Sequence, residues 1–314
     1  MSSFSPEAMP DLSGKVIFIT GGNAGLGKQA ALELAKHSPS RILIGSRHEH
    51  NAHTAIAQII EAVPGAQLTP VQLDLASLAS VKEAANKVLM MTPRLDILMN
   101  NAGIMAVPPA TTVDGYEIQF GTNHMGHAFL TNLLMPLLMK TAEQSQPGSD
   151  VRILTLTSHS HTRAPEGGID FSKLRSADTE SSPLTKYGVS KLANILHVKQ
   201  LAKRYPAIKV VAIHPGMVNT NLNSTMRQSS RLARLLMPIV SYFSATGVEE
   251  GVLNQLWGTT SAEVESGQYY EPVGIGGNGS PSTEDAELAE KLWAWTEEEL
   301  AGWTTKQAML QMSR

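Results

Sequence analysis

Tyr187 and Lys191 lie four residues apart in the segment SPLTKYGVSKLANIL, which has a helical pattern. Residues four apart share one face of a helix. A phenol ordinarily has a pKa near ~10, too high for efficient acid–base catalysis at neutral pH. A nearby ammonium favours the phenolate and lowers that pKa. The pair could therefore exchange a proton with a carbonyl or alcohol oxygen, although Tyr-x-x-x-Lys alone is common by chance.

Two further polar residues could complete such a site. Ser158 ends the apolar run VRILTLTS, so we expect it at the carboxyl edge of a parallel sheet, where ligands bind. Its hydroxyl could stabilise charge that develops on a reacting oxygen. Asn123 falls inside a predicted long helix, where asparagine is unfavourable. A specific role is one interpretation of Asn123, and a satisfied interior amide is the other.

The elements that position these residues alternate between strands and helices. Apolar runs predict strands at 15–20, 41–46, 68–75, 95–103, 151–158 and 208–216. Helical patterns follow these strands at 25–37, from the end of the second strand to about 60, near 77–91, and at roughly 114–140 and 184–204. A final amphipathic helix contains Trp293, Trp295 and Trp303. Strands that are apolar throughout and alternate with helices indicate an α/β fold, a Rossmann-type doubly wound parallel sheet with helices on both faces.

We predict one domain over residues 1–314. A cofactor-binding part would cover about 15–160, a substrate lid about 217–245 and a C-terminal cap about 264–314. The hydrophobic fraction of 42% in 314 residues is sufficient for a large core. Within the lid, RLARLLMPIVSYF at 231–243 is interpreted as a buried or lid helix, with a shallow membrane or partner contact as the alternative.

Composition argues against several classes of function. The net charge of −3 disfavours a nucleic-acid binder, and the lack of cysteine excludes disulfides and thiolate chemistry. The sequence shows no signal-peptide pattern and no apolar run of membrane-spanning length, so we expect a soluble, cytoplasmic protein without an integral membrane span. The ten histidines lack metal-binding spacing, and we predict no catalytic metal.

The segment FITGGNAGLGKQA lies where the first predicted strand becomes the first helix. Gly21, Gly25 and Gly27 follow a G-x-x-x-G-x-G spacing, and a tight glycine turn lets the backbone approach a pyrophosphate. The helix N-terminus adds unpaired N–H groups and a positive dipole. This position after a strand and before a helix favours a dinucleotide site over a plain glycine-rich turn.

The strand ends indicate which dinucleotide is bound. Ser46 and Arg47 stand where an acidic residue would bind the ribose of NAD. Arginine suits the 2′-phosphate of NADP, so we predict NADP(H) rather than NAD(H), with a solvated surface arginine as the alternative. Asp74 suits an adenine-edge contact or a helix N-cap. The small Ala102 and Gly103 would let a cofactor pass closely.

Together these residues resemble the short-chain dehydrogenase/reductases, from about Lys15 to His214. The family's T-G-x-x-x-G-x-G motif matches Thr20–Gly27, its N-N-A-G motif matches Asn100–Gly103, and its P-G motif matches Pro215–Gly216. The resemblance implies four catalytic residues, which are Asn123, Ser158, Tyr187 and Lys191. The expected cofactor contacts are Gly21, Asn23, Gly25, Leu26, Gly27, Ser46, Arg47, Asp74, Leu75, Asn101, Ala102, Gly103, Tyr187, Lys191, Pro215, Gly216, Val218 and Thr220. In this family the lysine also holds the nicotinamide ribose and, with the asparagine, supports a water relay.

Within the family, FGTNHMGHAFLTNLL, YGVSKLANIL and HPGMVNT resemble the retinol-dehydrogenase branch with its fungal and plant relatives. The long gap between Ser158 and Tyr187 is similar to that branch. Animal retinol dehydrogenases often carry an N-terminal membrane anchor, which this sequence does not show. We therefore expect a soluble enzyme of other metabolism.

By the family plan, the segment after the sixth strand closes over the substrate. Its apolar side chains are Met217, Val218, Leu222, Met226, Leu235, Leu236, Met237, Ile239 and Phe243. Methionine-rich walls adapt to varied apolar ligands, so we predict a small hydrophobic carbonyl or secondary alcohol, with core packing as the alternative for each residue. The expected substrate contacts are His159, Met217 and Leu222. The resemblance also implies a homodimer or homotetramer through the helices at 114–140 and 184–204.

These observations lead to two hypotheses of different kinds. The first is an NADP(H)-dependent oxidoreductase that transfers hydride between the nicotinamide and a carbonyl or secondary alcohol, with Tyr187 as acid and base. The alternative is a non-catalytic dinucleotide sensor or scaffold of the same fold, which the loss of a catalytic residue would indicate; all four are present. Sugar-nucleotide epimerases and dehydratases usually show T-G-x-x-G-x-x-G, which this chain lacks.

Overall fold

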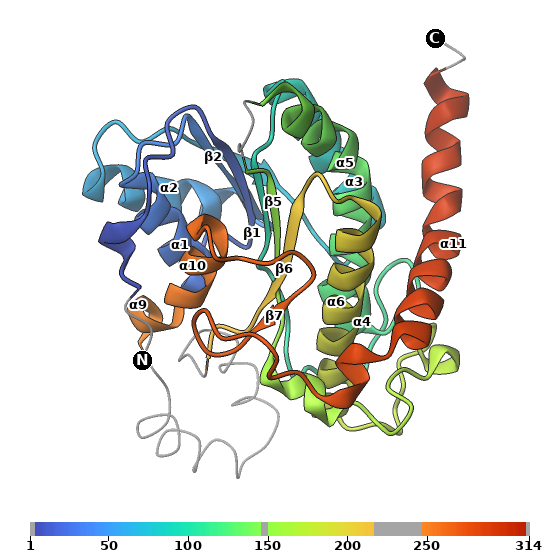
Figure 1. The fold of residues 1–314 in the computed structure, drawn as a ribbon. Coiled ribbons are helices and arrows are strands. Elements are labelled where there is room, and N and C mark those ends of the chain that lie inside the picture. The colour runs from blue at the N-terminus through green and yellow to red at the C-terminus, as the bar shows by residue number, and fades with distance from the viewer. Residues whose placement is uncertain (1–3, 146–149, 217–246, 312–314) are drawn as a thin grey trace.

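The computed structural model describes residues 4–145, 150–216 and 247–311. The chain forms a seven-stranded sheet in the order β3-β2-β1-β4-β5-β6-β7, with every neighbouring pair parallel (Figure 1). The strands are β1 Val16–Thr20, β2 Arg41–Ser46, β3 Leu68–Gln72, β4 Ile97–Asn100, β5 Arg152–Leu156, β6 Lys209–Ile213 and β7 Tyr269–Tyr270. The helices are α1 Gly25–Ala35, α2 Glu49–Ala62, α3 Leu78–Met91, α4 Ile118–Phe120, α5 Gly126–Gln144, α6 Pro183–Arg204, α9 Val248–Gly251, α10 Leu253–Thr260 and α11 Ala286–Gln311.

The doubly wound parallel sheet predicted from the sequence is confirmed. Strand β7 was not predicted, because two residues are too few to show a period. The helix predicted at 114–140 begins only at Ile118, because the Glu117 carboxylate caps α4 by accepting hydrogen bonds from two backbone N–H groups. A π-helical turn at Gly121–Met125 then separates α4 from α5. The apolar segment 231–243 lies outside the described residues.

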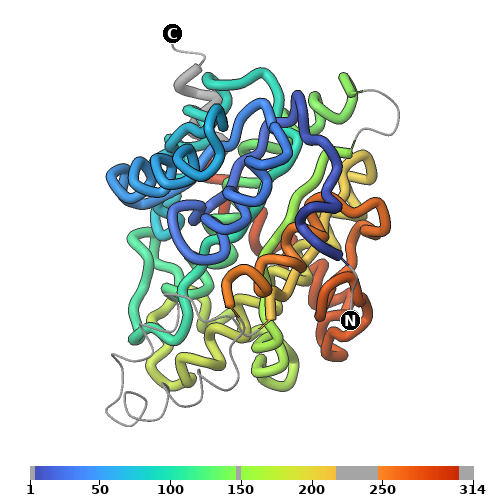
Figure 2. The backbone as a smooth tube through the Cα atoms, turned by 90° about the vertical axis from the view of Figure 1, so that its left-hand side faces the viewer, coloured from blue at the N-terminus to red at the C-terminus, as the bar shows by residue number. Residues whose placement is uncertain are grey.

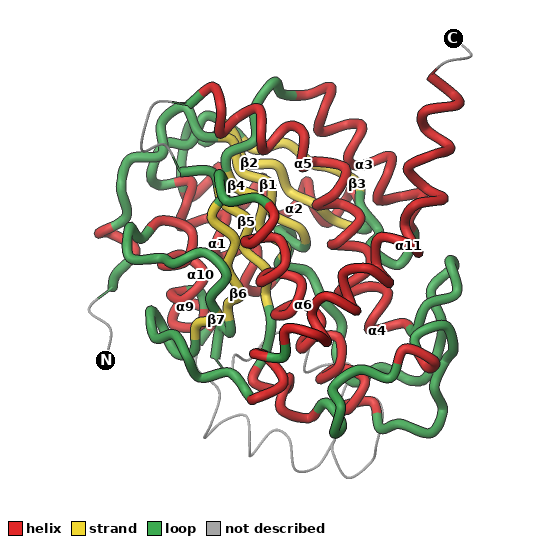
Figure 3. Tube along the Cα trace, turned by 45° about the vertical axis from the view of Figure 1, so that its right-hand side comes forward, coloured by secondary structure: helices red, strands yellow, loops and turns green. Residues whose placement is uncertain are grey.

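Helices cover both faces of the sheet, with α1, α2 and α10 on one side and α3, α5 and α6 on the other (Figures 1 and 3). Alternate residues of each strand enter different cores. Phe18 and Leu43 pack with α3, α5 and α6, whereas Ile17 and Ile44 pack with α1, α2 and α10. All four are fully buried, and each such side chain contributes about 1.5–3 kcal/mol by leaving water. Burial on both sides explains why the strands are apolar throughout.

The C-terminal part of the chain packs on both helical layers. Helix α10 contacts α1 on one face of the sheet (Figure 2). Helix α11 lies along α6 on the other face (Figure 1). The Trp295 ring of α11 meets the rings of Tyr116, Phe120 and Phe171 edge-on, at centroid distances of 6.2, 5.8 and 5.9 Å. Helix α11 thus covers part of α6, the helix through which the family resemblance implies contact with a second copy of the chain.

No helix in the described ranges, 4–145, 150–216 and 247–311, has the length and apolar character needed to cross a membrane.

We expect Trp295→Ala to lower the free energy of unfolding by about 3 kcal/mol, because the ring packs against three other aromatic rings. Urea unfolding followed by far-ultraviolet circular dichroism measures this change. The control is Val113→Ala, whose side chain is 82% exposed and whose effect should stay within about 0.5 kcal/mol. Equal stability of the two variants would show that α11 is not held through Trp295.

Candidate active site

The glycine turn between β1 and α1 has a backbone that requires glycine at three positions. Gly21 and Gly25 have φ angles of +66° and +52°, a region that glycine enters without steric cost. A Cβ on Gly27 would lie 2.4 Å from Nδ2 of Asn101 and 2.5 Å from the carbonyl oxygen of Gly21. Ala24 precedes α1 and provides no side-chain cap for its first N–H groups. These N–H groups can therefore receive an anion.

Of the other predicted contacts here, Asn23 lies within the turn and Leu26 in the first turn of α1.

The next two strands end at the same edge of the sheet. Ser46 is buried, and its hydroxyl donates to the His48 carbonyl at 3.0 Å. Arg47 follows directly and is exposed to solvent. The Asp74 carboxylate accepts a hydrogen bond from the Ala76 N–H at 3.0 Å, within the loop after β3.

The N-cap alternative for Asp74 is wrong. Helix α3 is capped by Ser77, whose hydroxyl accepts from the Ser80 N–H at 3.3 Å. The neighbouring Leu75 is buried, and its carbonyl lies where a Cβ on Gly126 would come within 2.4 Å. The Asp74 side chain therefore does not cap α3, and its contact with an adenine remains a prediction.

Asn123 lies in the π-helical turn, a kind of turn that is frequent at functional sites. The residue is fully buried. Its Oδ1 accepts from the Ile104 N–H at 2.8 Å, and its Nδ2 donates to the Ile104 carbonyl and to the Ser190 hydroxyl, both at 2.9 Å. The side chain is therefore a satisfied interior amide that ties the loop after β4 to α6.

Tyr187 and Lys191 share one face of α6, as their spacing predicted. Both are buried, and Nζ of Lys191 lies 5.6 Å from the centroid of the Tyr187 ring. Nζ donates to the Leu156 carbonyl at the end of β5, at 2.8 Å. A Cβ on Gly103 would lie 3.2 Å from Oδ1 of Asn123 and 3.6 Å from Nζ of Lys191. Asn123 and Lys191 therefore meet beside the N-N-A-G loop.

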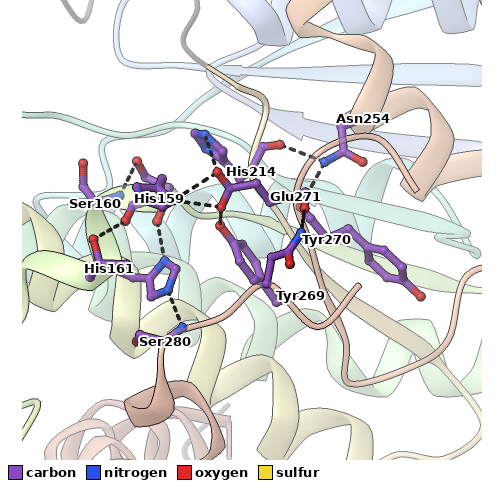
Figure 4. A network of polar contacts seen from close by, with 12 residues as sticks. His159, Ser160, His161, His214, Asn254, Tyr269, Tyr270, Glu271 and Ser280 are labelled. Atoms are coloured by element: carbon purple, nitrogen blue, oxygen red, sulfur yellow. Dashed lines mark hydrogen bonds and ion pairs between the residues drawn. The ribbon is translucent and has the colours of Figure 1, made fainter. Parts of the chain in front are cut away.

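Ser158 stands just after β5 and begins a short 3₁₀ turn. Its hydroxyl accepts from the Ser160 N–H at 3.1 Å and lies near enough to the Tyr187 hydroxyl to act on the pKa of that phenol. Its carbonyl accepts from Nδ1 of His161 at 2.8 Å, while Nε2 of His161 accepts from the Ser280 N–H at 3.0 Å (Figure 4). The structure thus places Ser158 against Tyr187 and anchors it to the C-terminal part of the chain.

Burial dominates the electrostatics of the Tyr187–Lys191 pair. It raises the pKa of Tyr187 to about 12, although the hydrogen bond from Ser158 acts in the opposite direction. It also lowers the pKa of Lys191 to about 7. The expectation that a nearby ammonium lowers the pKa of Tyr187 is wrong for the protein alone, because desolvation disfavours both the phenolate and the ammonium.

A second polar network joins the carboxyl ends of β5, β6 and β7 (Figure 4). The Glu271 carboxylate lies 3.1 Å from Nδ1 of His159 and 3.6 Å from Nε2 of His214. It also accepts a hydrogen bond from the Tyr269 hydroxyl. The Asn254 amide donates to the backbone carbonyl of His214, just after β6, and to that of Tyr270, the last residue of β7. Glu271 and Asn254 were not predicted from the sequence, because they belong to no motif and meet their partners only in the fold.

The His159 side chain is 65% exposed, beside Ser158 on the outer side of this network. Its contact with a substrate remains a prediction. Pro215 and Gly216 follow β6 at the same edge of the sheet. The predicted contacts Met217, Val218, Thr220 and Leu222 lie outside the described residues.

No group of three or more His, Cys, Asp and Glu side chains within the part of the chain that the structure describes could hold a metal ion.

The comparisons with known proteins agree with this geometry. A family model described as short chain dehydrogenase matches residues 15–164. The short-chain dehydrogenase/reductase drtF of Aspergillus calidoustus is 38% identical over 314 residues, covering 96% of this chain and 98% of the relative. Retinol dehydrogenase 14 of Mus musculus is 36% identical over 301 residues, covering 90% of this chain and 84% of the relative.

A solved structure of an uncharacterised protein from Mycobacterium paratuberculosis has a TM-score of 0.74 and 28% identity, covering 95% of this chain and 97% of that one. The sequence-based resemblance, including the retinol-dehydrogenase-like branch, is confirmed. The chain therefore belongs to the short-chain dehydrogenase/reductase family.

Proposed function

We propose that this oxidoreductase uses NADP(H) to transfer hydride between the nicotinamide and a hydrophobic carbonyl or secondary alcohol, with Tyr187 as acid and base. One observation carries the proposal. Ser158, Tyr187 and Lys191 are brought together at the carboxyl edge of the sheet, beside the loop that follows β4. Parallel sheets of this kind bind their ligands at this edge.

The residues of the glycine turn fit a nicotinamide dinucleotide. The uncapped N–H groups of α1 would hold its pyrophosphate, and Asp74 would contact its adenine. Arg47 would pair with a 2′-phosphate, and no carboxylate among the described residues forms an ion pair with its guanidinium. NADP(H), when bound, supplies or accepts the hydride.

The proton that accompanies hydride transfer would be exchanged by residues of the chain itself. With a pKa of about 12, the Tyr187 phenol is protonated at neutral pH and can donate to a carbonyl oxygen in the direction of reduction. The Ser158 hydroxyl hydrogen-bonds the same oxygen and stabilises its developing charge. Lys191, with a pKa of about 7, gains and loses a proton readily at neutral pH, so it can help to restore the proton of Tyr187.

The substrate class rests on two supports. The segment that follows Gly216 is rich in Met and Leu, residues that suit an apolar ligand. Retinol dehydrogenase 14, a relative at 36% identity, is named for an apolar alcohol. The alternative, a dinucleotide sensor or scaffold without catalysis, would bind cofactor and turn over no substrate.

We expect Tyr187→Phe to reduce turnover by about 10²–10⁴-fold, because the acid–base group is lost, while NADPH still binds. NADPH consumption with a panel of hydrophobic aldehydes, ketones, quinones and steroids measures the first effect, and NADPH fluorescence the second. Tyr205→Phe, at the end of α6, is the matched control and should keep full activity. Full activity in Tyr187→Phe would reject the mechanism. NADPH binding by the wild type without turnover of any compound would favour the sensor or scaffold.

We expect Arg47→Asp to weaken NADPH binding by about ten- to a hundredfold, since a hydrogen bond to a charged group contributes about 1.5–3 kcal/mol. NADH binding should change much less, because NADH lacks the 2′-phosphate. Fluorescence titrations with both cofactors give the two dissociation constants. Lys203→Asp makes the same change of charge at the exposed end of α6 and serves as the control. Equal losses for NADPH and NADH would remove Arg47 from the phosphate site.

A further inference from the structure

His127 lies four residues after Asn123, in the first turn of α5, and is buried. Its two ring nitrogens have partners from different parts of the fold. Nδ1 lies 2.9 Å from the backbone carbonyl oxygen of Asn123, and Nε2 lies 2.9 Å from Oγ1 of Thr20, the last residue of β1. The proposed reaction gives this histidine no direct part in the chemistry.

The partners of His127 determine where its proton lies. A carbonyl oxygen can only accept, so Nδ1 carries the hydrogen and donates to Asn123. In that tautomer Nε2 accepts, and the Thr20 hydroxyl donates to it at 2.9 Å, a shorter contact than the 3.4 Å to its other acceptor, the Met99 carbonyl. Oγ1 of Thr20 in turn accepts from the N–H groups of Asn101 and Ala102, at 2.9 and 3.0 Å. The hydrogen bonds therefore run in one direction, from the N-N-A-G loop through Thr20 and His127 to Asn123.

The ring keeps this arrangement because it stays neutral. An imidazolium has no acceptor, and Oγ1 of Thr20 already uses both of its lone pairs. Burial lowers the pKa of His127 to about 3, and the charge of Lys191 acts in the same direction, whereas the hydrogen bond to Asn123 opposes both. The contact therefore persists across the physiological pH range.

The main chain at Asn123 needs such support. In its π-helical turn the Gly126 N–H donates to the Gly121 carbonyl five residues back, rather than four. The Asn123 side chain is already committed to Ile104 and Ser190. A small shift of this turn would therefore change the position of the loop after β4 relative to α6, because the Asn123 side chain is bonded to both.

We propose that His127 is a positioning residue that holds the carbonyl of Asn123 and thereby fixes the catalytic face of α6 relative to the dinucleotide turn. The expected effect of His127 on turnover rests on the function proposed above. The hydrogen bond from His127 to the Asn123 carbonyl does not depend on that function. Two other buried histidines contact α11 instead. His124 lies 3.2 Å from the Thr296 hydroxyl, and His197 stacks on Trp293.

Three variants separate the two contacts. The amide nitrogen of asparagine can replace Nδ1, and the amide of glutamine can reach the position of Nε2. His127→Asn thus keeps a donor for Asn123 and loses Thr20, His127→Gln does the reverse, and His127→Phe loses both. With NADPH and decanal as the probe substrate, we expect kcat to fall at least about tenfold in the Phe and Gln variants. The Asn variant should stay within about threefold of wild type, with the same pH profile.

Amide hydrogen exchange of Gly121–Met125, followed by mass spectrometry with NADPH present, reports the positioning without turnover. We expect faster exchange in the Phe and Gln variants than in the Asn variant. The control His197→Phe replaces another buried histidine and should change neither exchange in this turn nor kcat. The inference would be overturned if the amides of Gly121–Met125 exchanged in His127→Phe at the wild-type rate. It would also be overturned if His127→Gln were closer to wild type than His127→Asn. Wild-type protein that binds NADPH and reduces no decanal, with exchange as expected, would count against the proposed function alone.

Discussion

Burial of the sheet on both faces is the constraint on which the rest of the structure depends. The strands serve two cores, so a polar side chain within them must find partners nearby, as the Arg152 guanidinium does by donating to the carbonyls of Gly258 and Ser261 at 2.9 and 2.8 Å. Ligand-facing chemistry can lie only where the strands end. At the carboxyl ends the backbone N–H groups of the loops leave the ladder, and the glycine turn, Asn101 and Ser158 all lie there. The candidate site thus follows from the layers that cover the sheet.

The same burial sets the chemistry of Tyr187 and Lys191. Neither charged form is favoured, since the pKa of the phenol is raised to about 12 and that of the amine is lowered to about 7. Lys191 has the Leu156 carbonyl as its hydrogen-bond acceptor at 2.8 Å. A further acceptor brought by a bound dinucleotide would favour the ammonium and, through it, the phenolate. The lowering of the Tyr187 pKa that the sequence predicts would therefore arise only once a dinucleotide is bound.

The sequence predicted those features that a short-range rule decides. The spacing of Tyr187 and Lys191 fixes a shared helical face, and the glycine spacing fixes a turn between strand and helix. It failed where long-range contacts decide. Glu271 meets His159 from a position 112 residues away, and nothing local indicates that pair. The π-helical turn at Gly121–Met125 was also missed, because a regular helical pattern runs through it. His127 could have been noticed, since it follows Asn123 at a spacing of four.

Helix α11 adds a constraint on assembly. One side of α6 packs on the sheet, and its other apolar surface needs a cover. The chain provides that cover itself. Trp293 stacks on His197 with ring centroids 5.3 Å apart, and the Arg204 guanidinium lies 4.5 Å from the Trp293 centroid. A second copy that docked on this part of α6 would have to displace those contacts and expose the tryptophans of α11. The homodimer or homotetramer that the family resemblance implies would therefore compete with α11 for the same surface, unless it used the part of α5 and α6 that α11 leaves open.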